Sequence, residues 1–209
     1  TVTGIPIGPW RSVSHAYTAY AVECFIDELA YASRKDPYDF RRALMIDARL
    51  RAVLDVAADK GNWRNVHPDG HYLGIAAHAS FGSYVAQVVE LSVLADGGIR
   101  VHRVVCAIDC GIVINPDTVV AQIEGSVVYG LTAALKGQIT FQNGRTAQSN
   151  FHDYPLLRMQ EMPEVDVYIV PSQEPPGGVG EPGVPPLAPA LADAVFAATG
   201  KRIGHLPIR

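Results

Sequence analysis

A loop rich in glycine and proline carries one acid that could do chemistry. Residues 175–186 read PPGGVGEPGVPP, so Glu181 is the only ionisable side chain in this stretch. Glycine has no Cβ, so a bulky ligand can come close to the main chain, and proline fixes φ and stiffens the loop. A single carboxylate in such a loop suits a general base beside a large cofactor. The alternative reading is a tight turn into the next helix with Glu181 only solvated, because turns are commonly built from glycine and proline.

Three helices are predicted in the first sixty residues or so. The first runs from a cap at Ser12 or Ser14 to about residue 33. The second begins at Asp36-Pro37 and holds Phe40 and Leu44, and the third covers about 47–60. Helical spacing of apolar residues predicts the buried faces. These are Val22, Phe25, Ile26 and Leu29 in the first helix and Leu50, Val53, Leu54 and Ala57 in the third.

Three strands and then a long helix are predicted after residue 70. Residues 71–80, 83–94 and 99–108 are strand candidates, and the turn Asp96-Gly-Gly98 predicts antiparallel pairing of the last two. Asn115-Pro116-Asp117 predicts the start of a helix to about residue 136. Its Ala121, Gly125, Gly130 and Ala134 predict a face in close contact with another backbone. A hairpin at Asn143-Gly144, a strand over 165–170 and a helix over 187–199 complete the series.

The total predicts an α+β fold with helices packed on a largely antiparallel sheet. The chain has 209 residues, 48% of them apolar, which is ample for a core. Its formal net charge is −4, and the sequence has no stripe of basic residues. It therefore lacks the positively charged surface that nucleic-acid-binding proteins use. No run reaches the roughly 18 apolar residues of a membrane-spanning helix. Three cysteines are too few for an iron–sulfur or structural zinc site, so we expect buried thiols at Cys24, Cys106 and Cys110.

Four sequence blocks together resemble the large subunit of molybdenum hydroxylases, the xanthine dehydrogenase/aldehyde oxidase superfamily. The resemblance is closest to the beta subunit of the isoquinoline 1-oxidoreductase type, which is also known as the membrane-bound aldehyde dehydrogenase type. The blocks follow family order from about residue 4 to the end. They are GPWRSV at 8–13, DCGIVINP at 109–116 with QIEG at 122–125, SNFHDYP at 149–155, and GVGEPG at 178–183 with its alanine-rich helix.

This resemblance implies hydroxylation of a carbon next to a heteroatom, with oxygen from water. The implied cofactor is a molybdenum ion held by a molybdopterin dithiolene, and the implied substrate is a small aldehyde or N-heteroaromatic compound. Glu181 matches the family's glutamate, the general base that activates the oxygen nucleophile. The resemblance also implies a partner, a small subunit with 2Fe-2S clusters, and an electron acceptor beyond it. A non-catalytic scaffold module that keeps the fold is the alternative.

Cofactor-side residues are also implied by the resemblance. Arg11, Gly178 and Gly180 match positions beside the cofactor, and a guanidinium can bond anionic oxygens. The superfamily's turn is glycine-rich where this chain has Arg-Ser-Val, and a plain surface charge remains the alternative for Arg11. No residue is predicted to ligate the metal. The roles of Asn150, Asp153, Tyr154, Gln122 and Glu124 stay open between support and contact.

The domain plan and the extent of the chain follow from the same comparison of blocks. Residues 1–70 are predicted as a helical segment of the molybdopterin-binding region and 71–209 as the α+β subdomain with the catalytic loop. Because family members are several times longer, we expect the chain to be a C-terminal part that binds no cofactor and has no turnover alone. A periplasmic or membrane-associated location is a further family expectation.

Overall fold

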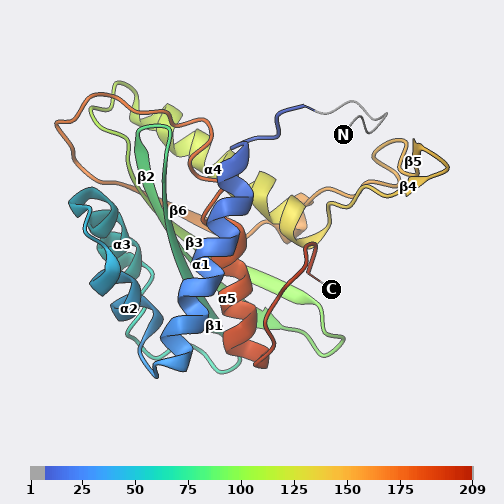
Figure 1. The fold of residues 1–209 in the computed structure, drawn as a ribbon, viewed down its shortest axis with the longest axis horizontal. Coiled ribbons are helices and arrows are strands. Elements are labelled where there is room, and N and C mark those ends of the chain that lie inside the picture. Colours follow the sequence, from blue (N-terminus) through green and yellow to red (C-terminus); the bar gives the residue numbers. More distant parts are fainter. Residues whose placement is uncertain (1–7, 209) are drawn as a thin grey trace.

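A four-stranded sheet forms the centre of the fold in this computed structural model, which describes residues 8–208 (Figure 1). The strand order is β1-β2-β3-β6. The first three strands pair antiparallel and β6 joins β3 in parallel, so the predicted pairing of the second and third strands is confirmed. The strands are β1 (Tyr72–Ser80), β2 (Ser83–Val93), β3 (Ile99–Asp109) and β6 (Glu164–Ile169).

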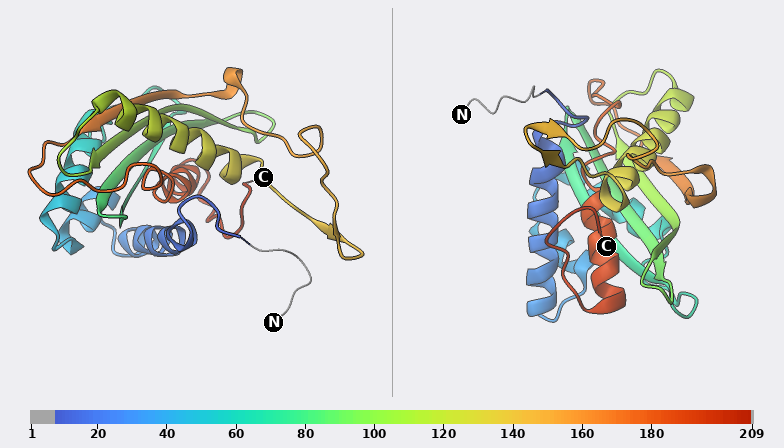
Figure 2. Two further views of the ribbon diagram at one scale, coloured as in Figure 1. Left: turned by 90° about the horizontal axis from the view of Figure 1, so that it is seen from above. Right: turned by 90° about the vertical axis from the view of Figure 1, so that its right-hand side faces the viewer.

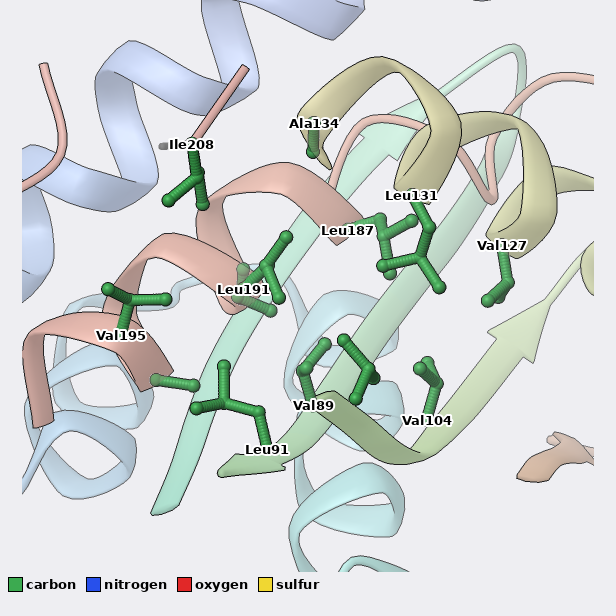
Figure 3. Packing of buried hydrophobic residues seen from close by; sticks show 14 residues of the cluster. Val89, Leu91, Val104, Val127, Leu131, Ala134, Leu187, Leu191, Val195 and Ile208 are labelled. Carbon is green, nitrogen blue, oxygen red and sulfur yellow. The ribbon is translucent and has the colours of Figure 1, made fainter. Parts of the chain in front are cut away.

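Helices cover both faces of this sheet, which confirms the α+β prediction. On one face lies α3 (Ala48–Lys60), with α2 (Pro37–Leu44) beside it. On the other lie α5 (Leu187–Thr199) and α4 (Pro116–Leu135), while α1 (Ser14–Ala32) packs outside α5 (Figure 2). Alternate residues of each strand pack on opposite faces of the sheet, because successive side chains of a strand point in opposite directions. Figure 3 shows the cluster on the α4/α5 face, where Leu131, Leu187 and Leu191 meet Val89 and Val104.

Local signals set several of these boundaries as predicted. The Asn115 side chain accepts a hydrogen bond from the Thr118 N–H at 3.2 Å and caps α4, whose first residue is Pro116. Gly200 ends α5 with φ of 71°, and its N–H donates to the Phe196 carbonyl. Helix α5 packs closely on the sheet where β1 has a glycine, because a Cβ on Gly74 would lie 2.0 Å from the Ala190 carbonyl oxygen.

The buried face predicted for α1 is wrong. Val22 is 53% exposed and Phe25 58% exposed, whereas Glu23 and Asp27 face inward. The reason is a buried arginine, Arg41 of α2, which pairs with both acids and draws the polar side of the helix into the fold. The predicted serine cap is also absent from this helix: Val13 holds the N-cap position and makes no side-chain capping bond.

The small-residue face predicted for α4 is correct in its second half only. A Cβ on Gly130 would lie 2.5 Å from a Leu187 side-chain carbon, and Ala134 is fully buried, but Ala121 and Gly125 are exposed. By length and composition α4 could cross a membrane, with a mean hydropathy of 1.3. It packs instead as a core helix on the sheet, so this is weak evidence for a membrane span.

An arm of irregular chain projects beyond the sheet between α4 and β6 (Figures 1 and 2). It carries the predicted hairpin, β4 (Phe141–Gln142) paired with β5 (Arg145–Thr146), and a short 3-10 helix, Met159–Glu161.

The three cysteines are free, with Cys106 and Cys110 buried as expected and Cys24 half-buried. The domain boundary at residue 70 stays a prediction, as α3 and the sheet share one core cluster. Residues 4–7, where the family resemblance begins, lie outside the described residues.

Candidate active-site loop

The Glu181 loop connects β6 to α5 and is held to the rest of the fold through its main chain. Early in the loop, the Gly177 N–H donates to the Cys110 carbonyl and the Gly178 N–H to the Phe81 carbonyl, both at 2.8 Å. Cys110 belongs to the DCG block at the end of β3, and Phe81 to the turn between β1 and β2. The loop is therefore tied to one end of the sheet, at the β1–β2 turn and at the end of β3, before it reaches Glu181.

Side chains from elsewhere bind a series of carbonyls along this loop. Each of these carbonyl oxygens belongs to a glycine or to Glu181, where the loop itself offers almost no polar side chains. The donors are Ser83 Oγ to Gly178 (2.6 Å), Arg11 Nε to Gly180 (2.7 Å), Ser12 Oγ to Glu181 (2.6 Å) and Gln87 Nε2 to Gly183 (2.8 Å). The loop is thus fixed by its surroundings as well as by its prolines, a feature that its own sequence does not reveal.

The glycines of the loop differ in how closely other atoms of the protein surround them. None of the four, at 177, 178, 180 and 183, has a φ in the left-handed region, so unusual backbone conformation is not their reason. A Cβ on Gly177 would lie 2.4 Å from the Gly82 carbonyl oxygen, and one on Gly183 would lie 2.8 Å from Ser126 Cβ. A Cβ on Gly180 would meet only Gln122 Oε1, at 3.8 Å. Packing within the protein requires glycine at 177 and 183 and leaves Gly180 open.

Arg11 connects the loop to α4. Its guanidinium donates twice to the Gly180 carbonyl, and Nη2 also donates to Ser126 Oγ at 2.8 Å and to Gln122 Oε1 at 3.3 Å. The Tyr129 ring lies beneath it, 5.7 Å from the guanidinium carbon to the ring centroid. Burial lowers the pKa of Arg11, and arginine stays charged at neutral pH all the same. Arg11 is therefore more than a surface charge, and its Nη1 has no hydrogen-bond partner within residues 8–208.

Ser12 is a site residue that the sequence reasoning missed. Its backbone N–H donates to Glu181 Oε1 at 2.9 Å, while its hydroxyl donates to the Glu181 carbonyl. Ser12 is fully buried and has a φ of 76°, and the next residue, Val13, has a φ of 41°. Positive φ is unusual outside glycine and is a true outlier for a β-branched residue. The only sequence signal was the Arg-Ser-Val departure from a glycine-rich turn.

The Glu181 carboxylate is half-buried and asymmetrically bonded. Oε1 accepts the Ser12 N–H, while Oε2 receives no hydrogen bond from the described part of the chain. One oxygen is thus fixed and the other is left to accept a proton. A cavity of about 600 Å³ lies nearby, with Trp10, Val13 and Val184 in its wall, but the Glu181 carboxylate does not line it.

The DCG block fixes the start of the loop. Asp109 accepts two hydrogen bonds from Arg49, at 2.7 and 2.6 Å, and one from the Gly111 N–H at 3.0 Å. The Arg49 guanidinium is the main reason why the pKa of Asp109 lies below its usual value. Gly111 has a φ of 74°, and a Cβ there would lie 2.2 Å from the Pro175 carbonyl oxygen. This block therefore supports the start of the loop.

The residues whose roles stayed open divide into two groups. Gln122 accepts a hydrogen bond from Arg11 and so belongs to the site, whereas Glu124 on the same helix makes no side-chain hydrogen bond or ion pair within residues 8–208. Asp153 accepts backbone hydrogen bonds from Ser149 and Asn150, which lower the pKa of its carboxyl group. These bonds organise a local turn in the projecting arm. Asn150 takes part in that same turn, and Tyr154 packs beside Gly137 at the base of the arm.

The site offers an anchored carboxylate and, among residues 8–208, no cluster of metal-binding side chains. Residues 8–208 hold no group of three or more histidine, cysteine, aspartate or glutamate side chains that could bind a metal ion. Arg11 Nη1 and Glu181 Oε2 instead have no hydrogen-bond partner among residues 8–208, and a Cβ on the neighbouring Gly180 would meet no atom of these residues closer than 3.8 Å. A guanidinium next to a glycine with open space beside it fits a large anionic ligand.

Residues 41–163 match the family described as the molybdopterin cofactor-binding domain. The chain belongs to this family. A relative from Brevundimonas diminuta, isoquinoline 1-oxidoreductase subunit beta, is 35% identical over 95% of this chain and 26% of its own length. Membrane-bound aldehyde dehydrogenase [pyrroloquinoline-quinone] from Gluconacetobacter polyoxogenes is 34% identical over 95% of this chain and 28% of its own length. The chain therefore spans about a quarter of the length of these relatives.

A solved structure shows the same fold. Aldehyde oxidoreductase from Desulfovibrio gigas superposes with a TM-score of 0.80 at 14% identity, over 95% of this chain and 40% of that chain. At this identity the likeness establishes the architecture alone. The predicted family, the α+β molybdopterin-binding fold and the cofactor class of the family are confirmed. The residue assignments at Glu181, Arg11, Gly178 and Gly180 remain predictions.

Proposed function

We propose that this chain is the part of a molybdenum-cofactor oxidoreductase that carries the general base, Glu181. The reaction is hydroxylation of an aldehyde or N-heteroaromatic carbon with oxygen from water. The observation that carries the proposal is the state of the Glu181 carboxylate. It sits in a rigid loop with Oε1 held by the Ser12 N–H and Oε2 open. The names of the relatives, an isoquinoline oxidoreductase, a nicotinate dehydrogenase and an aldehyde dehydrogenase, support the substrate class.

Arg11, Gly178 and Gly180 would lie against the cofactor. Arg11 Nη1 has no acceptor among residues 8–208 and can donate to an anionic oxygen, and Gly180 allows close approach. Gly178 can contribute contact surface only, because its N–H and carbonyl already bond Phe81 and Ser83. When bound, the molybdenum cofactor supplies the centre that activates the oxygen nucleophile and takes up the two electrons of the oxidation.

Proton transfer is the step that this chain performs. Glu181 Oε2 accepts the proton of the attacking oxygen as that oxygen bonds to the substrate carbon. General-base catalysis of this type contributes about 10²–10⁴-fold to a rate. Since Arg11 and Ser12 hold the loop in place before reaction, the carboxylate needs no reorganisation when charge moves, which is the advantage of a preorganised site.

The complete activity requires more polypeptide than these 209 residues. The chain has no cluster-binding cysteine set, and relatives named as subunits extend well beyond the matched region. We propose that further cofactor contacts and a small 2Fe-2S subunit complete the enzyme, and that the 209 residues alone bind no molybdopterin and do not turn over. A periplasmic or membrane-associated location remains a proposal from family resemblance.

The decisive experiment combines metal analysis with Glu181→Gln in the intact subunit complex. The expected result is stoichiometric molybdenum in both proteins and a loss of turnover on an aldehyde and N-heterocycle panel of at least about 10²-fold in the variant. The amide keeps the side-chain volume and removes the base. Variant activity within about threefold of wild type at equal molybdenum content would overturn the assignment.

Metal analysis also separates two other readings. A protein without molybdenum after cofactor-competent expression would be the non-catalytic scaffold alternative. One relative carries pyrroloquinoline-quinone in its name. Bound quinone with no molybdenum would identify that chemistry instead.

A further inference from the structure

Helix α1 presents an apolar stripe to solvent along its length. Val22, Phe25 and Leu29 are 53%, 58% and 39% exposed, and their spacing of three and four residues places them on one side of the helix. In both views of Figure 2, α1 lies at the margin of the described chain, outside α5. A soluble surface helix normally shows the opposite arrangement, with polar residues outward.

A buried ionic network prevents α1 from turning this stripe inward. Arg41, whose side chain is fully buried, pairs with Glu23 at 2.9 Å and Asp27 at 3.3 Å on α1, and with Asp193 at 2.9 Å on α5. Arg202 from the C-terminal tail adds a second cation at 2.6 Å from Asp27. Removing one partner from a buried ionic group is strongly unfavourable. The rotation of α1 is therefore fixed, and the outward position of the apolar stripe is a stable property of the fold.

We propose that this stripe is an internal interface, covered by polypeptide of the same subunit that lies outside these 209 residues. A helix with one buried polar face and one apolar face is explained if both faces are buried in the complete protein. Relatives that match 95% of this chain extend to about four times its length, since the match covers 26% and 28% of them. A subunit of that size has ample chain to cover α1.

The chemistry of the stripe favours a protein surface over a lipid surface. Residues 14–32 contain no lysine or arginine, whereas helices that bind membrane surfaces usually carry both on their polar face. The segment that covers the stripe should therefore be apolar and uncharged.

Photo-crosslinking in the intact subunit identifies what covers the stripe. A benzoylphenylalanine at position 25 reports on the stripe, and one at Asn65, an exposed loop position, is the control. The expected product joins position 25 to a peptide of the same polypeptide outside the 209 residues, at a yield independent of protein concentration. A crosslink to a second copy, to another subunit or to lipid would overturn the proposal, and so would the absence of any crosslink.

A second measurement covers the case in which the crosslinker disturbs the fold. Phe25→Ala removes apolar contact without adding charge, and Asn65→Ala is its matched control. In the intact subunit the first is expected to lower Tm by several degrees, because a covered phenylalanine is lost, and the second to leave Tm unchanged. An equal, negligible shift for both variants would show that Phe25 is solvent-exposed in the complete protein. Neither readout depends on turnover, so failure of the catalytic proposal would not affect it.

Discussion

Ser12 and Glu181 are joined by two hydrogen bonds, from the serine N–H to Oε1 and from the serine hydroxyl to the glutamate carbonyl. The two residues are 169 positions apart in the chain. This double contact fixes both the backbone and the side chain of the proposed base. It also explains the backbone of Ser12, because a φ of 76° directs the buried residue toward the loop at a cost on the order of 1–3 kcal/mol.

Ser12→Ala should reduce turnover without a matching change in affinity. The variant keeps the N–H contact to Oε1 but loses the hydroxyl contact to the Glu181 carbonyl, so the loop gains freedom. We expect kcat per bound molybdenum to fall about tenfold, since small misplacement of a catalytic group is costly, with KM unchanged. Ser14→Ala, two residues later and exposed, is the control. A drop in Tm and metal content with normal kcat per molybdenum would indicate structural support only.

The same contact can be examined without any assay of activity. Glu181→Ala removes the acceptor of the Ser12 N–H, and hydrogen exchange of the peptide containing residues 10–14 in the intact subunit should accelerate. Exchange in the β2–β3 hairpin serves as the internal reference. Unchanged exchange at 10–14 would mean that the carboxylate does not hold the turn.

Arg11→Lys should impair catalysis although the charge is kept. The guanidinium donates to Gly180, Ser126 and Gln122 from a planar fork, and a lysine ammonium cannot reproduce that set. We expect a fall in kcat on the order of 10–100-fold at the same protein stability within about 1 kcal/mol. Arg145→Lys in the exposed hairpin is the matched control. Wild-type rates with unchanged molybdenum content would remove Arg11 from the site.

Two glycine variants separate packing from cofactor approach. Gly177→Ala places a Cβ 2.4 Å from the Gly82 carbonyl oxygen, so we expect destabilisation of about 1–3 kcal/mol. Gly180→Ala meets no close protein atom and should fold normally, but it should lower molybdenum occupancy if the cofactor lies against this residue. Thermal unfolding and metal content measured together give the answer. Full occupancy in Gly180→Ala would place the cofactor elsewhere.

Local sequence signals predicted most of the fold. The cap at Asn115, the turn at Asp96-Gly-Gly98 and the terminal glycine at Gly200 act over a few residues, and each marks the boundary that it predicts. The predicted orientation of α1 was wrong for a physical reason. An apolar stripe indicates a buried face only when nothing stronger competes, and here buried ion pairs between Arg41, Glu23 and Asp193 compete successfully.

The site was predictable only in part. The glycine–proline loop identified Glu181, because its composition is visible within twelve residues. The partners of that loop are Ser12, Arg11, Ser83 and Gln87, which come from distant parts of the chain and carry no shared local pattern. The loop carbonyls that they bind exist at every residue, so composition could not show which would be used.

His78 should make the stability of the fold sensitive to acid. Its Nε2 lies 2.9 Å from His15 Nδ1, and the pKa of His78 is lowered to about 4, mainly by burial and secondly by the charge of His15. An unfolded histidine titrates near pH 6.5, so between about pH 6.5 and 4 the unfolded chain binds more protons than the folded one. The contribution of this group is fully present above about pH 6.5 and is lost as the pH falls toward 4.

The pH dependence of unfolding in the intact subunit tests this linkage. After allowance for partial exposure, His78 should account for a loss on the order of 1–2 kcal/mol between pH 7 and pH 4.5. His78→Gln cannot titrate, so its stability should decline less over this range than that of the wild type. His205→Gln, at an exposed histidine, should follow the wild-type curve. Parallel curves for wild type and His78→Gln would show that His78 titrates alike in the folded and unfolded chain.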